Sequence, residues 1–461
     1  MFTCSVKVLK LHRNLPEIYK TMAFSGYRCI YAILWTLFLY CEMCYTDCMA
    51  KKRRYPRKKS IVFTQKQKSI LCIVLLILIF SVFLSVIIIK RNGKILDVAY
   101  YRLPVTVTDS LSSQIKKSYS GKIRFKVLPA DTGLSQNKAL RYDLLFTWNG
   151  VRADILAEKA VVLPSLLYAQ IPSSERKLGI VNGKERMLPL LYDHYEVSFL
   201  KETAKKSGAV PEDWNTFMRY LHTDTSGTYV IPFFAAGADN RSLLAFVGAL
   251  ADALTGSDGY GHLTALVKDT ASLDSVIDEP FGTLSDGKTA VNLRYVLDLI
   301  ASWQKAGIMH KTWFNGSGAD AASFMKDTIT SAVFMPLSEH RTFPLRTVYP
   351  YESSHFPINA NITNHALIAP AIVLISYSKN PLFTETIGSL ISVQTQEELS
   401  NVTQLAPASS RAGAYDKEAD DVRFWAAAYR GGPVPDLLNA AFESDTKAAV
   451  FAEEIRKYLE K

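Results

Sequence analysis

Residues 95–161 decide the fold class, because strand-like and helix-like stretches alternate there. The strand-like stretches read ILDVAYYR (95–102), IRFKVL (123–128) and YDLLF (142–146). Residues 106–118 and 153–161 carry the apolar spacing of helices. This alternation predicts an α/β fold with a parallel sheet and helices on its faces.

Polar and aromatic residues follow the ends of these strands. Tyr101 and Arg102 end the first strand, and Trp148 and Asn149 follow the third. Ligands in such sheets bind at the carboxyl ends of the strands. We therefore expect these four residues to lie at a binding site.

The alternation continues to the C-terminus. An extended apolar run occupies 187–193, and 199–207 predicts a helix. Residues 288–305 predict a strong amphipathic helix, 328–335 a strand and 366–375 a buried strand. A chain of 461 residues, 48% hydrophobic and 21% charged, is not mainly disordered and suits two lobes with additional segments.

The charge of the chain is unevenly distributed. The net charge is +10, but residues 49–68 alone carry nine Lys and Arg and no acidic residue, and residues 92–461 sum to −3. This excludes a basic, nucleic-acid-binding body. All six cysteines lie in the first 72 residues, so the remainder has neither a disulfide framework nor a thiolate metal site.

A membrane anchor is expected near the N-terminus. Ile70–Ile89 contains 20 residues without a charge, enough to cross roughly 30 Å of hydrocarbon. We predict one transmembrane helix at 69–90, with 49–68 in the cytoplasm and the C-terminal body in the periplasm or outside the cell. Residues 1–48 are interpreted as an extension before a true start at Met49, although the short apolar run 29–41 leaves a second membrane segment open.

The sequence does not single out catalytic machinery. Residues 282–289, GTLSDGKT, fit the phosphate-loop pattern, but the required buried strand does not precede them. We interpret them as a turn in which Asp286 or Thr289 caps the next helix. His340, His355 and His365 are expected in the core or on the surface, not on a metal. We predict no enzyme, cofactor or metal.

Three tryptophans adjoin loops and could offer an apolar face to a sugar, namely Trp148, Trp313 and Trp425. For any one of them, packing in the core is the simpler interpretation.

Several segments, in order, resemble the family 1 extracellular solute-binding proteins, the maltose-binding-like receptors of ABC importers. SGAVPEDWNTF (207–217) is similar to the family's Gly…Pro…Thr-Trp-Asp-Glu-Phe signature. MLPLLYD (187–193) resembles the strand that crosses to the second lobe. Residues 156–158, 231–239 and 378–408 resemble further family segments, and the resemblance covers about 95–461.

The chain also departs from the family pattern. Residues 195–198 replace a Tyr-Asn pair, 326–328 replace a glycine, and a helix anchor stands in place of a cleaved or lipidated leader.

The resemblance implies a two-lobed, periplasmic-binding-protein-like fold. We expect lobe 1 to comprise 95–190 and 346–400, and lobe 2 to comprise 191–345 and 401–461. A small solute, a sugar or oligosaccharide, would bind between the lobes and be presented to the permease of an ABC importer in the inner membrane. An envelope scaffold with a degenerate cleft and an extracytoplasmic hydrolase are the alternatives. The candidate ligand-binding residues are Tyr101, Arg102, Trp148, Asn149, Asp193, Asp239, Arg241, Trp313, Ser338 and Trp425.

Overall fold

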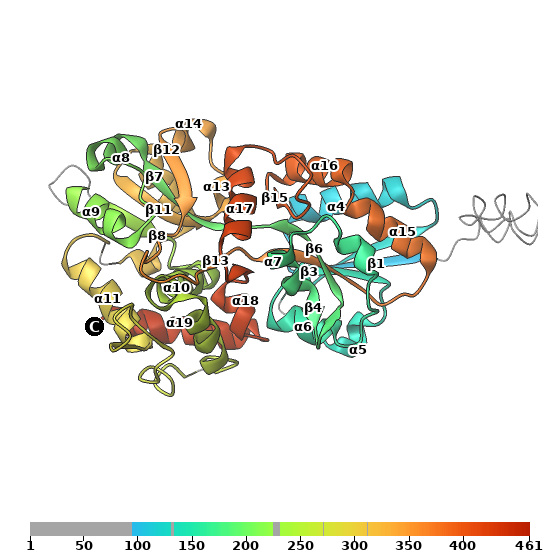
Figure 1. Cartoon of the computed structure of the whole chain (residues 1–461), viewed down its shortest axis with the longest axis horizontal. Helices are drawn as coiled ribbons and strands as arrows, with labels where there is room; N and C mark the ends of the chain where they lie inside the picture. The colour runs from blue at the N-terminus through green and yellow to red at the C-terminus, as the bar shows by residue number, and fades with distance from the viewer. Residues whose placement is uncertain (1–94, 131–132, 225–230, 271, 311) are drawn as a thin grey trace, which may run out of the picture. The chain divides into compact units, whose positions relative to one another are not determined.

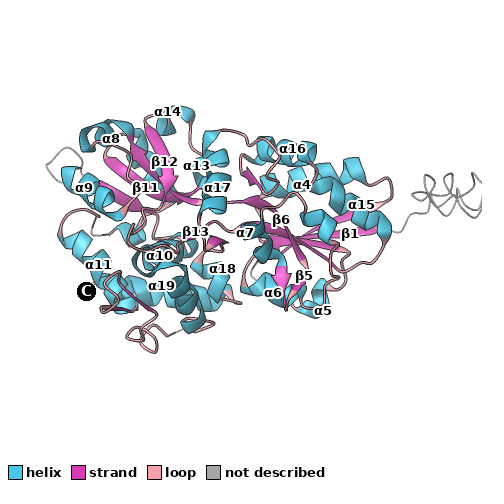
Figure 2. Cartoon of the chain, in the orientation of Figure 1, coloured by secondary structure: helices cyan, strands magenta, loops and turns pink. Residues whose placement is uncertain are grey.

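The computed structural model describes residues 95–461, apart from 131–132, 225–230, 271 and 311. These residues form two α/β lobes, each with its own sheet and hydrophobic core (Figures 1 and 2). The expected extension, basic segment and membrane helix at 1–90 lie outside the described residues. Across the described part of the chain, we find no helix that combines the length and the apolar character needed to cross a bilayer.

Lobe 1 is built on a six-stranded sheet in the order β15-β6-β14-β3-β1-β2. β1 pairs in parallel with β2 and β3, which confirms the predicted parallel sheet, whereas β14 runs antiparallel to β3 and β6. The strands are β1 (Leu96–Tyr101), β2 (Ile123–Leu128), β3 (Leu144–Trp148), β6 (Met187–Tyr192), β14 (Ala371–Ser376) and β15 (Ala406–Pro407).

Amphipathic helices cover the sheet of lobe 1. In α4 (Val105–Ser118), Val107, Leu111 and Ile115 recur at a spacing of four residues and are buried. α4 packs against α15 (Pro381–Leu390) and α16 (Val393–Thr403), helices from a much later part of the chain. The helices that cover this sheet are therefore complete only after the chain has returned from lobe 2.

Lobe 2 is built on a four-stranded sheet in the order β12-β7-β11-β8. β8 and β11 are parallel, and β7 is antiparallel to both β11 and β12. The long α10 (Asn240–Leu266) packs against α11 (Leu293–Lys305) and α19 (Asp445–Leu459). The strands are β7 (Tyr195–Leu200), β8 (Ile231–Ala235), β11 (Thr330–Pro336) and β12 (Tyr351–His355).

In the described part of the chain, three segments connect the lobes. Asp193 and His194 join β6 to β7. Residues 356–370 lead from β12 to β14 and contain β13 (Ala366–Ile368). Residues 429–436 lead from α17 (Lys417–Ala428) to α18 (Leu437–Ala441) and contain β16 (Gly432–Val434), which pairs in parallel with β13. We call these three segments the hinge.

Two of the expected lobe boundaries lie elsewhere in the structure. The return to lobe 1 was expected at 346, but β12 still pairs with β7 of lobe 2. The final crossing was expected at 401, but α17 packs on β15 of lobe 1. The expected strand 366–375 is divided into β13 and β14, because Pro370 stands between them and has no N–H to donate to a sheet.

Two local predictions, the helix at 199–207 and the turn at 282–289, can be compared with the structure. The expected helix 199–207 begins only at α8 (Lys201–Ser207), since Phe199 and Leu200 end β7. The phosphate-loop match is a hairpin between β9 (Gly282–Thr283) and β10 (Ala290–Val291). The Asp286 carboxylate accepts hydrogen bonds from the backbone N–H groups of Lys288 and Thr289, which confirms the turn. The predicted cap was wrong, because α11 begins at Leu293 and its N-cap is Asn292, not Asp286 or Thr289.

Candidate functional site

Arg241 lies at the centre of the polar residues that the two lobes bring together. Its guanidinium carbon lies 4.6 Å from the ring centroid of Trp148 in lobe 1 and 5.6 Å from that of Tyr195 in lobe 2. Its Nε lies 3.1 Å from Asp436 Oδ2, and its Nη2 lies 3.8 Å from Asp193 Oδ2. One cation thus joins two aromatic rings and two carboxylates. We call these five residues the interlobe cluster.

The ends of secondary-structure elements position this cluster. Trp148 is the last residue of β3, and Arg241 lies in the first turn of α10. Asp193 lies in the first hinge segment, and Asp436 is the N-cap of α18. The cluster therefore draws on both lobes and on the hinge, so a change in the angle between the lobes changes its geometry.

Both carboxylates of the interlobe cluster are fully buried. Asp193 accepts hydrogen bonds from the backbone N–H of Ser338 at 2.9 Å and from its hydroxyl at 2.8 Å. Asp436 accepts bonds from Asn439 N and Nδ2 at 3.1 and 2.8 Å. Burial raises the pKa of Asp193, and the charge of Arg241 opposes this rise. Arg241 is therefore the main group that favours the ionised form of Asp193.

A second set of contacts also joins the lobes. Arg102 and Arg152 of lobe 1 reach the same carboxylate of Asp445 in lobe 2, at 2.5 and 2.8 Å. Arg152 Nε also donates to the backbone carbonyl of Glu443 at 2.5 Å. Arg102 has a φ of 60°, and its carbonyl accepts a bond from Trp148 Nε1 at 2.9 Å. This unusual backbone conformation thus links the ion pair to the interlobe cluster.

The two lobes also touch through backbone at Gly150. Its φ is +117°, and a Cβ at this position would lie 2.1 Å from the backbone carbonyl oxygen of Asn439 in α18. Only glycine permits this approach without a shift of one lobe. The facing surfaces of the lobes are therefore in direct contact in this structure.

The lobe 2 side of the site carries further acidic groups. Asp239 caps α10 by accepting a bond from Ser242 N at 2.8 Å. Glu339, in α13 (Leu337–His340), is partly buried, and burial followed by the charges of Asp239 and Asp193 raises its pKa to about 7. This side therefore offers hydrogen-bond acceptors, whereas the facing side carries Arg102 and Trp148.

The structure brings six of the ten predicted residues to this region. Trp148, Asp193 and Arg241 belong to the interlobe cluster. The other three lie around the cluster. The Ser338 hydroxyl donates a hydrogen bond to Asp193, and Trp148 donates one to the carbonyl of Arg102. Asp239 lies among the acidic groups of lobe 2.

The other four predicted residues lie elsewhere. Tyr101 belongs to the core of lobe 1, and Trp313 to the core of lobe 2, where it lies 5.4 Å from Phe246 between ring centroids. The side-chain oxygen of Asn149 accepts a bond from Ala371 N at 2.8 Å and so fastens β14. Trp425 packs against His194 of the hinge and His355 of β12, as described below.

Sequence reasoning missed Tyr195, Asp436 and Asp445. Tyr195 follows a predicted binding residue by two positions, so its place in the next strand could have been found. Asp436 precedes a short helix, and its capping pattern was detectable. Nothing in the sequence relates Asp445 to Arg102, because 342 intervening residues separate them.

Among the described residues, no group of three or more His, Cys, Asp or Glu side chains is arranged to hold a metal ion. The cluster instead combines aromatic faces with carboxylates and a guanidinium. Such a combination suits polyhydroxylated ligands, whose apolar faces stack on rings and whose hydroxyls bond to charged groups.

Comparisons with known proteins agree with the two-lobed architecture. No family model and no curated protein matches the sequence. Solved structures do match. The bacterial solute receptor AcbH, described as exclusively preferring β-D-galactopyranose, has a TM-score of 0.60 at 14% identity over 80% of this chain and 94% of its own. The ligand-free form of RafE from Streptococcus pneumoniae has a TM-score of 0.58 at 15% identity over 80% and 97%.

A putative binding protein, MsmE from Bacillus subtilis, matches in an open conformation with a TM-score of 0.55 at 12% identity over 80% of this chain and 96% of its own. The matches thus span almost the full length of these receptors. At such low identity they establish the fold alone: the described part of residues 95–461 has the two-lobed α/β fold of these proteins.

Proposed function

We propose that this protein is a membrane-anchored, extracytoplasmic solute-binding protein that takes a sugar or oligosaccharide between its lobes. The observation that carries the proposal is the interlobe cluster, where both lobes and the hinge place aromatic rings beside buried carboxylates. Neighbouring structures support the ligand class, because RafE is described in complex with raffinose and another neighbour as a chitin oligosaccharide binding protein.

Solute entry requires the lobes to separate, since they touch directly in the structure. Asp445 carries both arginine ion pairs, and its side chain is 37% exposed. Ion pairs that solvent reaches contribute only about 0–1 kcal/mol each, so these two pairs add little to the cost of opening. A solute that stacks on Trp148 replaces the guanidinium of Arg241 there, and its hydroxyls take the place of other interlobe contacts. The solute thus shifts the equilibrium between open and closed forms.

The anchor and the partner complete the proposal. The apolar run at 70–89 with the basic stretch before it would hold the body on the outer side of the inner membrane, beside the permease of an ABC importer. One structural neighbour is described as a probable secreted solute-binding lipoprotein. A short tether keeps the receptor at high local concentration near its permease.

A thermal-shift screen of the full chain in detergent tests the proposal. The panel contains monosaccharides, oligosaccharides, polyols, amino acids and short peptides. A ligand that binds only the folded state stabilises it by about 2.7 kcal/mol at a hundred times its dissociation constant. We expect a sugar to raise the midpoint of wild-type protein. A well-folded protein that responds to no sugar would contradict the proposed ligand class.

A second candidate function rests on the contact between the lobes. Because Arg241 occupies the space between Trp148 and Tyr195, the fold could serve as an envelope scaffold whose cleft no longer binds a solute. The variant Arg241→Ala separates the two functions. For a receptor, the variant still binds the solute with altered affinity. For a scaffold, neither wild type nor variant responds to any member of the panel.

A further inference from the structure

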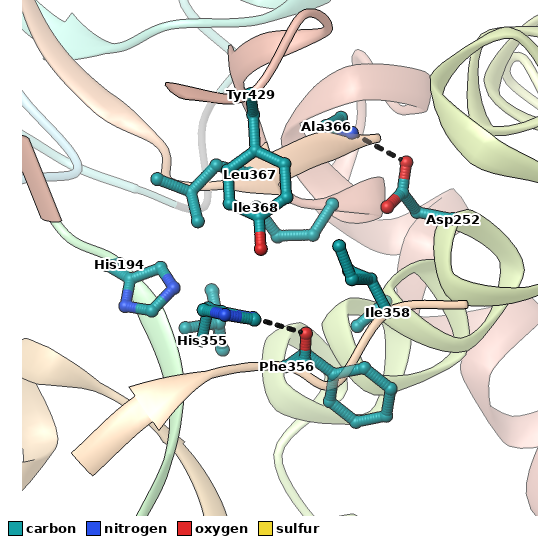
Figure 3. A pocket seen from close by; sticks show the side chains of 11 residues that line it. His194, Asp252, His355, Phe356, Ile358, Ala366, Leu367, Ile368 and Tyr429 are labelled. Atoms are coloured by element: carbon teal, nitrogen blue, oxygen red, sulfur yellow. Dashed lines mark hydrogen bonds between the residues drawn. The ribbon is translucent and has the colours of Figure 1, made fainter. Parts of the chain in front are cut away.

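A small cavity lies inside the hinge, and Tyr195 of the interlobe cluster forms part of its wall. Its volume is about 20 Å³. Each hinge segment contributes to its wall: His194 from the first, residues 356, 358 and 366–368 from the second, and Tyr429 from the third. His355, the last residue of β12, and Asp252 of α10 complete its polar lining (Figure 3).

The polar side chains around this cavity have unused hydrogen-bonding capacity. His194 is 1% exposed, and within the described structure its Nδ1 has no hydrogen-bond partner. His355 Nδ1 lies 2.9 Å from the backbone carbonyl of Phe356 and must therefore carry the proton, which leaves Nε2 as an acceptor. The hydroxyl of Tyr429 points into the same space as both imidazoles (Figure 3).

The three polar groups that face the cavity, His194, His355 and Tyr429, are uncharged. Burial lowers the pKa of His194 to about 3 and also lowers that of His355, so both rings are uncharged at neutral pH. Asp252 already accepts bonds from Ala366 N at 2.9 Å and from His365 at 3.1 Å. A neutral ligand with both donors and acceptors fits these groups better than an ion.

We propose that the cavity binds one water molecule, which links the three segments of the hinge. About 10–15 Å³ accommodates a single water, and a buried water commonly makes about three hydrogen bonds. The water donates to His355 Nε2, bonds to His194 Nδ1 and accepts from the Tyr429 hydroxyl. The cavity is too small for a solute, and no group of three metal-ligating side chains surrounds it in the described structure.

This water has a mechanical consequence. Direct contacts already tie the segments, because β13 pairs with β16 and Asp193 N donates to Pro370 O at 2.9 Å. His194 and His355 in addition pack against Trp425, with ring centroids 5.2 and 5.3 Å apart. Within this packed region, a water can reorient its bonds while the segments twist, whereas a direct hydrogen bond would have to break.

The test is a crystal structure of the full chain in detergent, at a resolution that shows ordered water. We expect one peak at hydrogen-bond distance from His355 Nε2 and Tyr429 Oη. The variant Tyr429→Phe keeps the ring, which lies 5.5 Å from that of His355, and removes the hydroxyl. The peak should disappear in this variant and persist in the matched control Tyr415→Phe, whose ring is 45% exposed.

Amide hydrogen exchange tests the link between the segments. In Tyr429→Phe, exchange should become faster in residues 193–195, 366–368 and 432–434 together, with no change in Tyr415→Phe. An empty cavity in wild-type protein would overturn the proposal, as would a metal or other ion at the peak. Faster exchange confined to the segment that contains residue 429 would overturn the linking role.

Discussion

Replacing Arg241 by methionine removes the only cation of the interlobe cluster while keeping an unbranched side chain. Asp193 and Asp436 then remain fully buried with no charge of opposite sign at their present distances of 3.8 and 3.1 Å. Removing one partner of a buried ion pair costs about 3–5 kcal/mol. Because the side chain of Arg241 is 25% exposed, solvent screens part of the interaction. We expect the free energy of unfolding to fall by roughly 2–3 kcal/mol at neutral pH.

The loss should depend on pH in a defined direction. Without Arg241, the pKa of Asp193 in the folded state rises further above its value in the unfolded chain, about 3.9. The folded state then binds more protons than the unfolded state, so stability falls as pH rises above that value. The difference between wild type and variant is therefore largest at neutral pH and smaller near pH 4–5, by up to about 1.4 kcal/mol per pH unit through Asp193.

Urea unfolding of both proteins between about pH 4.5 and 7.5 measures this difference. Arg346→Met in α14 (Leu345–Val348) is the matched control, because Arg346 is exposed. The control should differ from wild type by less than about 0.5 kcal/mol at every pH. If Arg241→Met behaves like the control, or loses more stability in acid than at neutral pH, the assigned role of Arg241 is wrong.

Three other predictions concern closure and the hinge. Asp445→Asn weakens both interlobe arginine pairs, so spin labels on the two lobes should move apart. The free energy of unfolding should change by less than about 1 kcal/mol. Unchanged distances between the labels would show that these pairs do not hold the lobes together. Gly150→Ala places a Cβ against Asn439 and strains the backbone at φ +117°. It should lower the free energy of unfolding by about 1–3 kcal/mol and open the lobes. A variant that stays closed and fully stable would show that this contact does not require glycine. Both ring nitrogens of His365 lie 3.1 Å from acceptors. Burial alone would lower the pKa of His365, but the contact with Asp252 outweighs it and raises the pKa, so the stability that this contact confers is complete below about pH 6.5 and lost as pH rises through the folded-state pKa. The gap in unfolding free energy between wild type and His365→Gln should therefore shrink as pH rises above about 6.5, and a gap independent of pH would contradict this.

The sequence predicted the parts of the fold that depend on local pattern. The strands at 95–102, 123–128 and 142–146 formed the expected parallel pairing, because their apolar character and the helices around them suffice to specify it. The boundary at 346 was wrong, since β12 contains His355 and two serines and reads as a loop. Its strand exists because β7 offers it an edge, which is a property of the assembled sheet.

The candidate site shows the same division. Trp148 and Arg102 were found because they follow strands, and strand ends meet at one edge of a sheet. Trp313 also adjoins a loop, yet its ring is 1% exposed, because the core of lobe 2 surrounds that loop. The partners of Arg241 come from three distant segments, so the charge balance of the cluster could not be calculated before the structure placed them.

The most direct test of the receptor function is a calorimetric titration of the full chain with the sugar that gives the largest thermal shift. Trp148→Ala removes the aromatic face of lobe 1, and Phe424→Ala, whose ring is 72% exposed on α17, is the matched control. We predict that Trp148→Ala binds at least about tenfold more weakly, a loss of about 1.4 kcal/mol, and that the control binds like wild type. Equal affinity of all three proteins would place the ligand outside the interlobe cluster and contradict the proposed site.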